Sequence, residues 1–72
     1  MKLMVGQNCS PCTMLKTWLQ EQNIEVEQIM AEENMSLAQE LGIRSVPTLI
    51  LDDNSLIMGI ELIKEHFKKE SE

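Results

Sequence analysis

Two cysteines separated by two residues are the side chains in this sequence best suited to chemistry. Cys9 and Cys12 enclose Ser10 and Pro11 in a Cys-Ser-Pro-Cys segment. Because thiolates attack disulfides and bind soft metal ions, a cysteine pair at this spacing is typical of thiol-disulfide exchange or of metal binding. A bridge between them would close a loop too short to stabilise a small domain, so a purely structural disulfide is disfavoured.

The two cysteines lie where a strand is expected to lead into a helix. Lys2–Val5 is a short, mostly apolar segment that ends at Gly6, which favours a buried strand. Pro11 fits the first turn of a helix, because its missing N–H would have no partner there. After Cys9, apolar residues recur at the three- and four-residue spacing of one helix face as far as about residue 22. These residues are Cys12, Leu15, Trp18 and Leu19.

A helix start gives the two thiols different chemical roles. The unpaired N–H groups and the positive end of the helix dipole stabilise a thiolate, so we expect the pKa of Cys9 to fall below the usual value of about 8.5. Cys9 is therefore the predicted nucleophile, which attacks a substrate disulfide and forms a mixed disulfide. Cys12, one helical turn further on, is predicted to attack that mixed disulfide and release the reduced substrate. This exchange requires no metal ion and no organic cofactor.

The middle of the chain predicts a second strand and a second helix. Over residues 24–28, Ile24, Val26 and Gln28 alternate with Glu25 and Glu27, with the period of two that is typical of a strand. Glu32 and Glu33 favour the start of a helix through the helix dipole, and Gly42 is placed to cap its end. Together with the first strand and helix, these elements form a βαβα half.

The last third of the chain predicts two strands and a closing helix. Residues 46–51 are rich in β-formers and contain a proline that suits the beginning of a strand. Residues 52–54 form a turn signal, after which residues 55–58 can return antiparallel. Apolar residues at helical spacing over residues 60–67 predict the final helix. The order βαβαββα therefore predicts an α/β fold, with a four-stranded mixed sheet flanked by helices on both faces.

Length, composition and charge limit what this chain can do. Its 72 residues, of which 43% are hydrophobic, are enough for a single domain over residues 1–72. The net charge of −6 leaves no cationic surplus for nucleic acid, and no apolar run approaches the roughly 20 residues that cross a membrane. Paired cysteines in a reducing cytosol serve redox or metal chemistry more often than structure. We expect a cytoplasmic monomer that binds neither nucleic acid nor membranes.

Two motifs in order make the sequence resemble a known family. The Cys-Ser-Pro-Cys segment after a first strand, the segment Val46-Pro47-Thr48 and the final hairpin and helix are similar to the glutaredoxin branch of the thioredoxin fold. The resemblance covers essentially the whole chain. It implies a cis peptide bond between Val46 and Pro47 beside the active-site sulfurs. It also implies that the Val46 backbone pairs with an extended substrate segment.

Within this branch, the sequence departs from the members that use glutathione. Those proteins resemble one another in a lysine before the first cysteine, and in a glycine pair followed by an aspartate that binds glutathione. Here Gln7 and Asn8 precede Cys9, and residues 58–61, Met-Gly-Ile-Glu, stand in place of the glycine pair and the acid. Arg44 is the candidate for attracting an anionic substrate to this acidic chain.

The compact length and the incomplete glutathione motif resemble the small glutaredoxin-like redoxins of the NrdH type. Those redoxins accept electrons from thioredoxin reductase and deliver them to ribonucleotide reductase. The resemblance implies a protein disulfide as the substrate, with thioredoxin reductase or glutathione as the electron source. Ser10 and Pro11 are predicted to support the site by altering the stability of the thiolate and hence the reduction potential.

Two other uses of the cysteine pair stay open. Small ferredoxin-like copper-binding domains also place a Cys-x-x-Cys pair before their first helix, so a carrier of a soft metal, copper or zinc, is the main alternative. Its βαββαβ order differs from the order expected here, and Pro11 would lie between the ligands. The third use is a cluster held between two subunits with glutathione.

The remaining conspicuous side chains are assigned to packing or to the surface. The scattered methionines are expected to fill gaps in a core that has one phenylalanine. Trp18 is expected in the core or at its rim, and His66 at the surface or its boundary. Lys16 is expected to be solvated, and Lys64 and its neighbours to place positive charge toward the end of the last helix.

Overall fold

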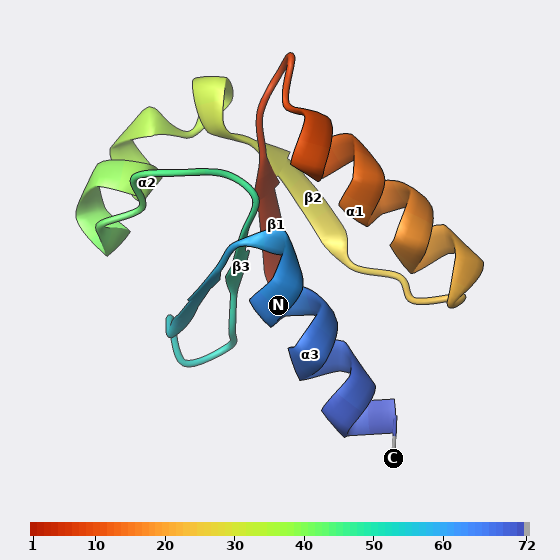
Figure 1. The fold of residues 1–72 in the computed structure, drawn as a ribbon. Coiled ribbons are helices and arrows are strands. Elements are labelled where there is room, and N and C mark those ends of the chain that lie inside the picture. The colour runs from red at the N-terminus through yellow and green to blue at the C-terminus, as the bar shows by residue number, and fades with distance from the viewer. Residues whose placement is uncertain (72) are drawn as a thin grey trace.

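The computed structural model describes residues 1–71, and side chains as far as residue 69, as a mixed sheet with helices packed on it (Figure 1). Along the chain, its elements are β1 (Lys2–Val5), α1 (Ser10–Glu21), β2 (Glu27–Met30), the 3₁₀ turn η1 (Ala31–Glu33), α2 (Met35–Leu41), β3 (Thr48–Ile50), β4 (Leu56–Met58) and α3 (Ile60–Ser71). Among the described residues, no helix has both the length and the apolar sequence needed to span a membrane.

The sheet has the strand order β2-β1-β3-β4, with β1 and β3 in the centre. β1 runs parallel to β2 and antiparallel to β3, so that Leu3 lies opposite Gln28 on one side and Leu49 on the other. β3 and β4 form an antiparallel pair in which Leu49 faces Ile57. The predicted four-stranded mixed sheet flanked by helices is thereby confirmed.

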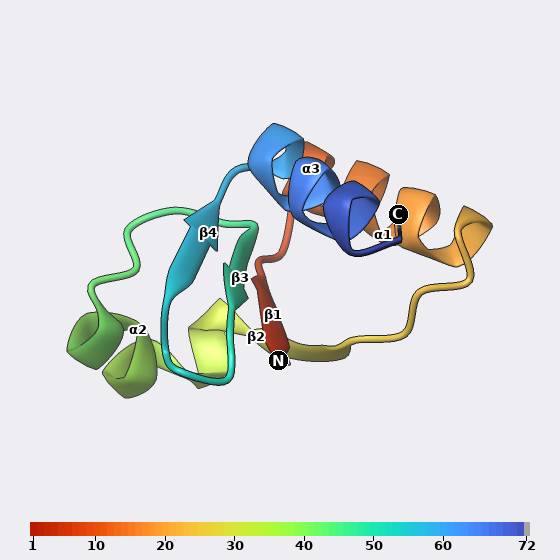
Figure 2. The ribbon, with the colours of Figure 1, turned by 90° about the horizontal axis from the view of Figure 1, so that it is seen from below.

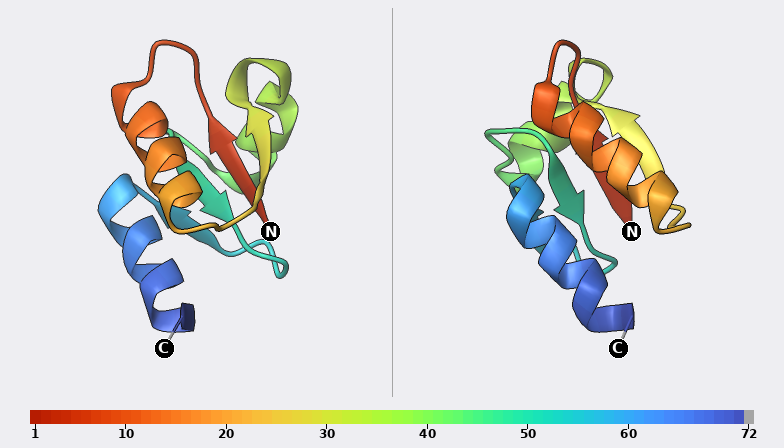
Figure 3. Two further views of the ribbon diagram at one scale, coloured as in Figure 1. Left: turned by 90° about the vertical axis from the view of Figure 1, so that its right-hand side faces the viewer. Right: turned by 45° about the vertical axis from the view of Figure 1, so that its right-hand side comes forward.

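The three helices divide unequally between the two faces of the sheet. α1 and α3 lie side by side on one face, and α2 lies on the other (Figures 2 and 3). Since successive side chains of a strand point to opposite faces, Leu3 and Val5 of β1 face α1 and α3, whereas Met4 faces the side of α2. α2 contains no fully buried residue, so the tightly packed core lies on the face covered by α1 and α3.

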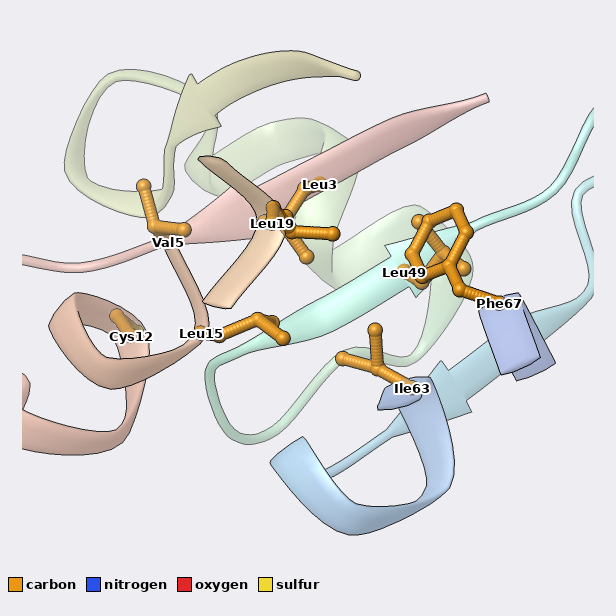
Figure 4. Close-up of a cluster of buried hydrophobic side chains, with 8 residues drawn as sticks. All are labelled: Leu3, Val5, Cys12, Leu15, Leu19, Leu49, Ile63 and Phe67. Carbon is orange, nitrogen blue, oxygen red and sulfur yellow. The ribbon is translucent and has the colours of Figure 1, made fainter. Parts of the chain in front are cut away.

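The core joins one face of α1 to the two central strands and to α3 (Figure 4). Cys12, Leu15 and Leu19 are each at most 2% exposed, which follows from their three- and four-residue spacing along the helix. Their partners from the sheet and from α3 are Leu3, Val5, Leu49, Ile63 and Phe67. The reactive cysteine pair is therefore tied to the core through Cys12.

Several predicted boundaries differ from the structure. The third strand occupies Thr48–Ile50 rather than residues 46–51, so Pro47 precedes it. The second strand occupies Glu27–Met30 rather than residues 24–28, because these four residues pair in register with Lys2–Val5. Ile24 and Val26 precede the strand and pack against the core, so their periodicity reflected burial and not strand pairing. Glu32 and Glu33 lie in the 3₁₀ turn, and α2 begins only at Met35.

The predicted helix cap at Gly42 is present in the structure. Gly42 follows α2 with a φ of 79°, a left-handed conformation that glycine adopts without the strain that a Cβ atom would cause. The N–H of the next residue, Ile43, donates to the Ala38 carbonyl at 2.8 Å. The cap turns the chain from α2 toward the segment that contains Val46 and Pro47.

Replacing Leu15 with alanine tests the importance of the face of α1 that packs on the sheet. Leu15 is 0% exposed, so Leu15→Ala should leave a cavity and lower the free energy of unfolding by about 3 kcal/mol. Leu62→Ala is the matched control, because Leu62 is a helical leucine that is 56% exposed. Urea unfolding followed by circular dichroism measures both variants. Equal losses of stability in the two variants would contradict the described core.

Candidate active site

The first turn of α1 holds the cysteine pair. Cys9 is the N-cap residue, with φ −113° and ψ 103°, and its Sγ accepts a hydrogen bond from the Cys12 N–H at 3.2 Å. Sulfur thus takes the position that a serine or aspartate oxygen takes at other helix starts. The two cysteines form a disulfide, and their Cα atoms are 5.2 Å apart. The structure therefore describes the oxidised form of the pair.

The two sulfur-bearing residues differ in exposure. Cys12 is 1% exposed and belongs to the core, whereas Cys9 is only partly buried and lines an open groove. Ser10 and Pro11, between them, are exposed on the first turn of the helix. A partner molecule can therefore reach the pair through Cys9.

The loop before Cys9 is held by two contacts. A Cβ atom on Gly6 would lie 3.1 Å from Cγ2 of Val46, so the absence of a side chain lets this loop approach the segment before β3. The Gln7 N–H donates a hydrogen bond to Oε1 of Glu32 at 3.0 Å. This bond stabilises the charged carboxylate and lowers the pKa of Glu32 below its usual range. Asn8 then turns the chain with a φ of 53°.

The segment before β3 lies beside the disulfide. The Val46 carbonyl oxygen is 3.9 Å from Sγ of Cys9, and the peptide bond between Val46 and Pro47 is cis. Two further hydrogen bonds fix this segment: Oγ1 of Thr48 donates to the Ser45 carbonyl at 2.6 Å, and the Gly59 N–H donates to the Pro47 carbonyl at 3.1 Å. Pro47 itself is buried. Val46 backbone atoms are thus held next to the accessible sulfur.

Arg44 lies apart from the sulfur-lined groove. Its side chain is exposed and lines a smaller hollow of about 310 Å³ on the α2 side of the sheet. Val46 lines that hollow as well, so it adjoins both the cysteine pair and the hollow of Arg44. The structure therefore brings together the two cysteines, Val46 and Pro47, and it places Arg44 in a neighbouring depression.

The groove that Cys9 lines is the largest hollow described on this surface, at about 960 Å³. It follows α1 and is bordered by α3, and its lining includes Met14, Trp18 and Lys64. Sequence reasoning assigned Trp18 to the core or its rim and Lys64 to the charge at a helix end. The four-residue spacing from Ser10 through Met14 to Trp18 was a signal for a common helix face. Lys64 had no such signal, because only the packing of α3 on α1 brings it there.

Metal ligation would require more donors than the cysteine pair supplies. Among the side chains described, those of residues 1–69, no three or more His, Cys, Asp and Glu side chains come together in a group that could hold a metal ion. Cys9 and Cys12 supply two sulfur atoms, which in this form are bonded to each other.

Fold and site together define a protein of the thioredoxin-like class, with a cysteine pair at the start of its first helix. The profile of the thioredoxin domain family matches residues 1–70, and the chain belongs to that family. The resemblance to a glutaredoxin-like redoxin of the thioredoxin fold is confirmed. Family and cysteine pair together indicate redox activity.

Two curated relatives share part of the sequence. The glutaredoxin-like protein NrdH of Lactococcus lactis is 35% identical over 49 residues, which are 64% of this chain and 68% of that protein. The SPbeta prophage-derived thioredoxin-like protein YosR of Bacillus subtilis is 34% identical over 44 residues, which are 61% of this chain. The match spans 55% of the length of YosR.

Solved structures agree with the fold over nearly the whole chain. The crystal structure of the thioredoxin-like protein BC3987 superposes with a TM-score of 0.71 at 20% identity, covering 92% of this chain and 94% of that one. A mutant of the same protein gives a TM-score of 0.70. At this identity the likeness concerns the fold.

The hydrogen bond between Gln7 and Glu32 predicts a pH-dependent signal beside Cys9. The lowered pKa of Glu32 means that this bond stabilises the loop at neutral pH and is lost as the pH falls through that pKa. In an NMR titration, the Gln7 amide shift should therefore change with a midpoint below the usual glutamate pKa. Glu32→Gln should keep an oxygen acceptor and abolish the titration. A midpoint at the usual glutamate value would contradict the contact.

Proposed function

We propose that this protein is a thiol-disulfide oxidoreductase that reduces protein disulfides through Cys9 and Cys12. The observation that carries the proposal is the difference in exposure between the two cysteines at one helix start. Cys9 opens to a groove, and Cys12 lies behind it in the core, 1% exposed. This arrangement suits an attacking thiol and a resolving thiol, which must act in that order.

The reaction begins with the reduced pair. The Cys9 thiolate, stabilised by the Cys12 N–H and by the helix dipole, attacks one sulfur of the substrate disulfide. A bond forms between Cys9 and that sulfur, the substrate disulfide breaks, and the other substrate sulfur leaves as a thiolate. The Cys12 thiolate then attacks Sγ of Cys9 and releases the second substrate thiolate. Two electrons pass from the dithiol to the substrate, and the protein ends as the disulfide.

The segment before β3 is the proposed binding edge for the substrate backbone. An extended chain bearing the disulfide would pair with backbone groups of Val46, whose carbonyl oxygen lies 3.9 Å from Sγ of Cys9. Pro47, which is buried, holds this edge in place through the hydrogen bond from Gly59 to its carbonyl. We assign Arg44 the attraction of an anionic group from the adjacent hollow.

Ser10 and Pro11 are proposed to support the exchange from the first turn of α1. Pro11 has a fixed φ and no N–H, so it keeps the turn between the cysteines rigid in both redox states. Ser10 is exposed beside the accessible sulfur and lines the same groove. Both residues would act on the relative stability of dithiol and disulfide, which sets the reduction potential.

The electron source and the partner follow from the resemblance to small redoxins. We propose thioredoxin reductase rather than glutathione as the donor, because residues 58–61 lack the glycine pair and aspartate of the glutathione-using members. Ribonucleotide reductase is the proposed acceptor. Similarity to the glutaredoxin-like protein NrdH supports this assignment. The proposal places the protein in the cytoplasm as a monomer, a single domain over residues 1–72.

The metal-carrier alternative fits the site less well. A carrier transfers its ion between exposed sulfurs, and here one sulfur belongs to a residue that packs among Val5, Leu15 and the rest of the core. Cys12 would have to leave this core to ligate an ion together with Cys9. Tight copper(I) binding by the monomer without disulfide exchange would favour the carrier.

Serine replacements of the two cysteines test the order of attack. Cys9→Ser should abolish reduction of insulin by dithiothreitol above the uncatalysed rate, because the accessible nucleophile is lost. Cys12→Ser should accumulate a mixed disulfide through Cys9, because the resolving thiol is missing. Mass spectrometry of the unreduced protein identifies the adduct. Turnover that survives in Cys9→Ser, or an adduct on Cys12 in that variant, would rule out this mechanism.

Parallel assays with two electron sources test the proposed donor. We expect insulin reduction with NADPH and thioredoxin reductase at least tenfold faster than with glutathione, glutathione reductase and NADPH. Both assays follow NADPH absorbance at equal protein concentration, and Cys9→Ser provides the background rate for each. Faster turnover with glutathione would mean that Arg44 and the Val46 backbone suffice to bind it.

A further inference from the structure

We propose that the groove between α1 and α3 binds the stretch of a substrate protein adjoining its disulfide and selects for a carboxylate about four residues from the reacting cysteine. The inference rests on the proposed function and deepens it, because it names the substrate chemistry. Cys9 is one of the residues that line the groove, so a peptide segment bound there would lie next to the accessible sulfur. Residues of α1 and of the loop before it make up most of the lining, and α3, which lies beside α1 in Figure 3, contributes Lys64.

The length of the groove determines how many residues of the substrate chain it can hold. Along α1 its lining advances by single turns from Cys9 through Thr13 and Thr17 to Glu21. Trp18 lies nine positions after Cys9, which at about 1.5 Å per helical residue corresponds to roughly 13 Å. An extended chain covers that distance in about four residues. The fourth residue from a cystine at Cys9 would therefore lie beside Trp18.

The part of the groove nearest Cys9 is lined by uncharged groups. Met14 is 62% exposed there, which is high for a long apolar side chain. The Thr13 hydroxyl donates to the Cys9 carbonyl at 3.2 Å, and the Thr17 hydroxyl to the Thr13 carbonyl at 3.1 Å. Asn8 and Ser10 also line this portion of the groove, so it suits a small or apolar uncharged side chain next to the substrate cysteine.

The charge in the groove lies further from the sulfur. Nζ of Lys64 stands 5.7 Å from the centroid of the Trp18 ring, so the ammonium is held over an aromatic face at the groove wall. Among the described residues that line this groove, Lys64 carries the positive charge, and Glu21 carries a negative charge one turn beyond Trp18. A substrate carboxylate bound near Trp18 would therefore lie close enough to form an ion pair with the Lys64 ammonium.

The overall charge makes this position selective. With 12 acidic and 6 basic residues, the chain repels an acidic segment over most of its surface. Lys64 offsets that repulsion at one point, about four extended residues from Cys9. A segment whose carboxylate lies at that spacing gains an ion pair with Lys64, whereas a carboxylate elsewhere in this groove gains none and lies closer to Glu21 if it is further from Cys9.

Peptide disulfides measure this selectivity during turnover. The substrates are symmetric disulfides of short peptides with a leucine beside the cysteine and either glutamate or glutamine four residues from it, on the N-terminal or the C-terminal side. Dithiothreitol supplies the electrons. The wild type should show a kcat/KM about threefold higher for the preferred glutamate peptide than for its glutamine counterpart, the size expected of one partly exposed ion pair.

Two lysine variants on the same helix distinguish an effect of the groove from an effect of the net charge of the protein. In Lys64→Glu the glutamate preference should disappear or reverse. In Lys68→Glu it should persist, because Lys68 is exposed one turn further along α3 and does not line the groove. The ratio of the two peptides within one variant is the readout, so a change in sulfur reactivity common to both peptides cancels. The proposal would be overturned if the wild type showed no preference, or if Lys64→Glu kept the glutamate-to-glutamine ratio of the wild type.

Binding without chemistry keeps this test distinct from that of the proposed function. Trp18 is the single tryptophan of the chain, so its fluorescence reports on the groove. Peptides with serine in place of cysteine should change this fluorescence, with a weaker affinity for the glutamine form and for Lys64→Glu. If no peptide disulfide is reduced but this binding pattern is found, the oxidoreductase assignment fails and the groove stands. If disulfides are reduced without the pattern, the groove assignment fails.

Discussion

The packing of one face of α1 on the central strands is the constraint on which the site depends. Cys12, Leu15 and Leu19 are buried against β1, β3 and α3, so the rotation of the helix about its axis is fixed. That rotation leaves Cys9 at the N-cap, half-buried beside the Val46 carbonyl. Exposure of one sulfur and burial of the other are therefore consequences of helix packing and not of the cysteines themselves.

Four separate segments meet around that helix start through one close approach and three hydrogen bonds. Gly6 permits a close approach to Val46, and the Glu32 carboxylate accepts a hydrogen bond from the Gln7 amide. The Thr48 hydroxyl and the Gly59 amide fix the turn that contains Pro47. These contacts come from both halves of the chain, so the surroundings of the cysteine pair depend on the assembled fold.

Local sequence patterns were enough to predict β1, α1 and the Gly42 cap, because each of these features depends on residues that are close together in the chain. The predicted position of β2 was wrong, because hydrogen-bonded pairing with β1 decides which residues join the sheet, and the alternation of side chains does not. The cysteine pair at a helix start could be predicted from spacing and Pro11. The place of Lys64 beside Trp18 could not, because it arises from the packing of two helices far apart in sequence.

The two faces of the sheet are covered unequally, so the helices on them should differ in how readily they open. α2 has no fully buried residue, whereas the face under α1 and α3 holds a continuous core. Segments with little buried apolar surface open at a lower free energy than the core. α2 should therefore open locally at a lower free energy than α1. Local opening of the backbone and the cysteine pair are then expected on opposite sides of the same four strands.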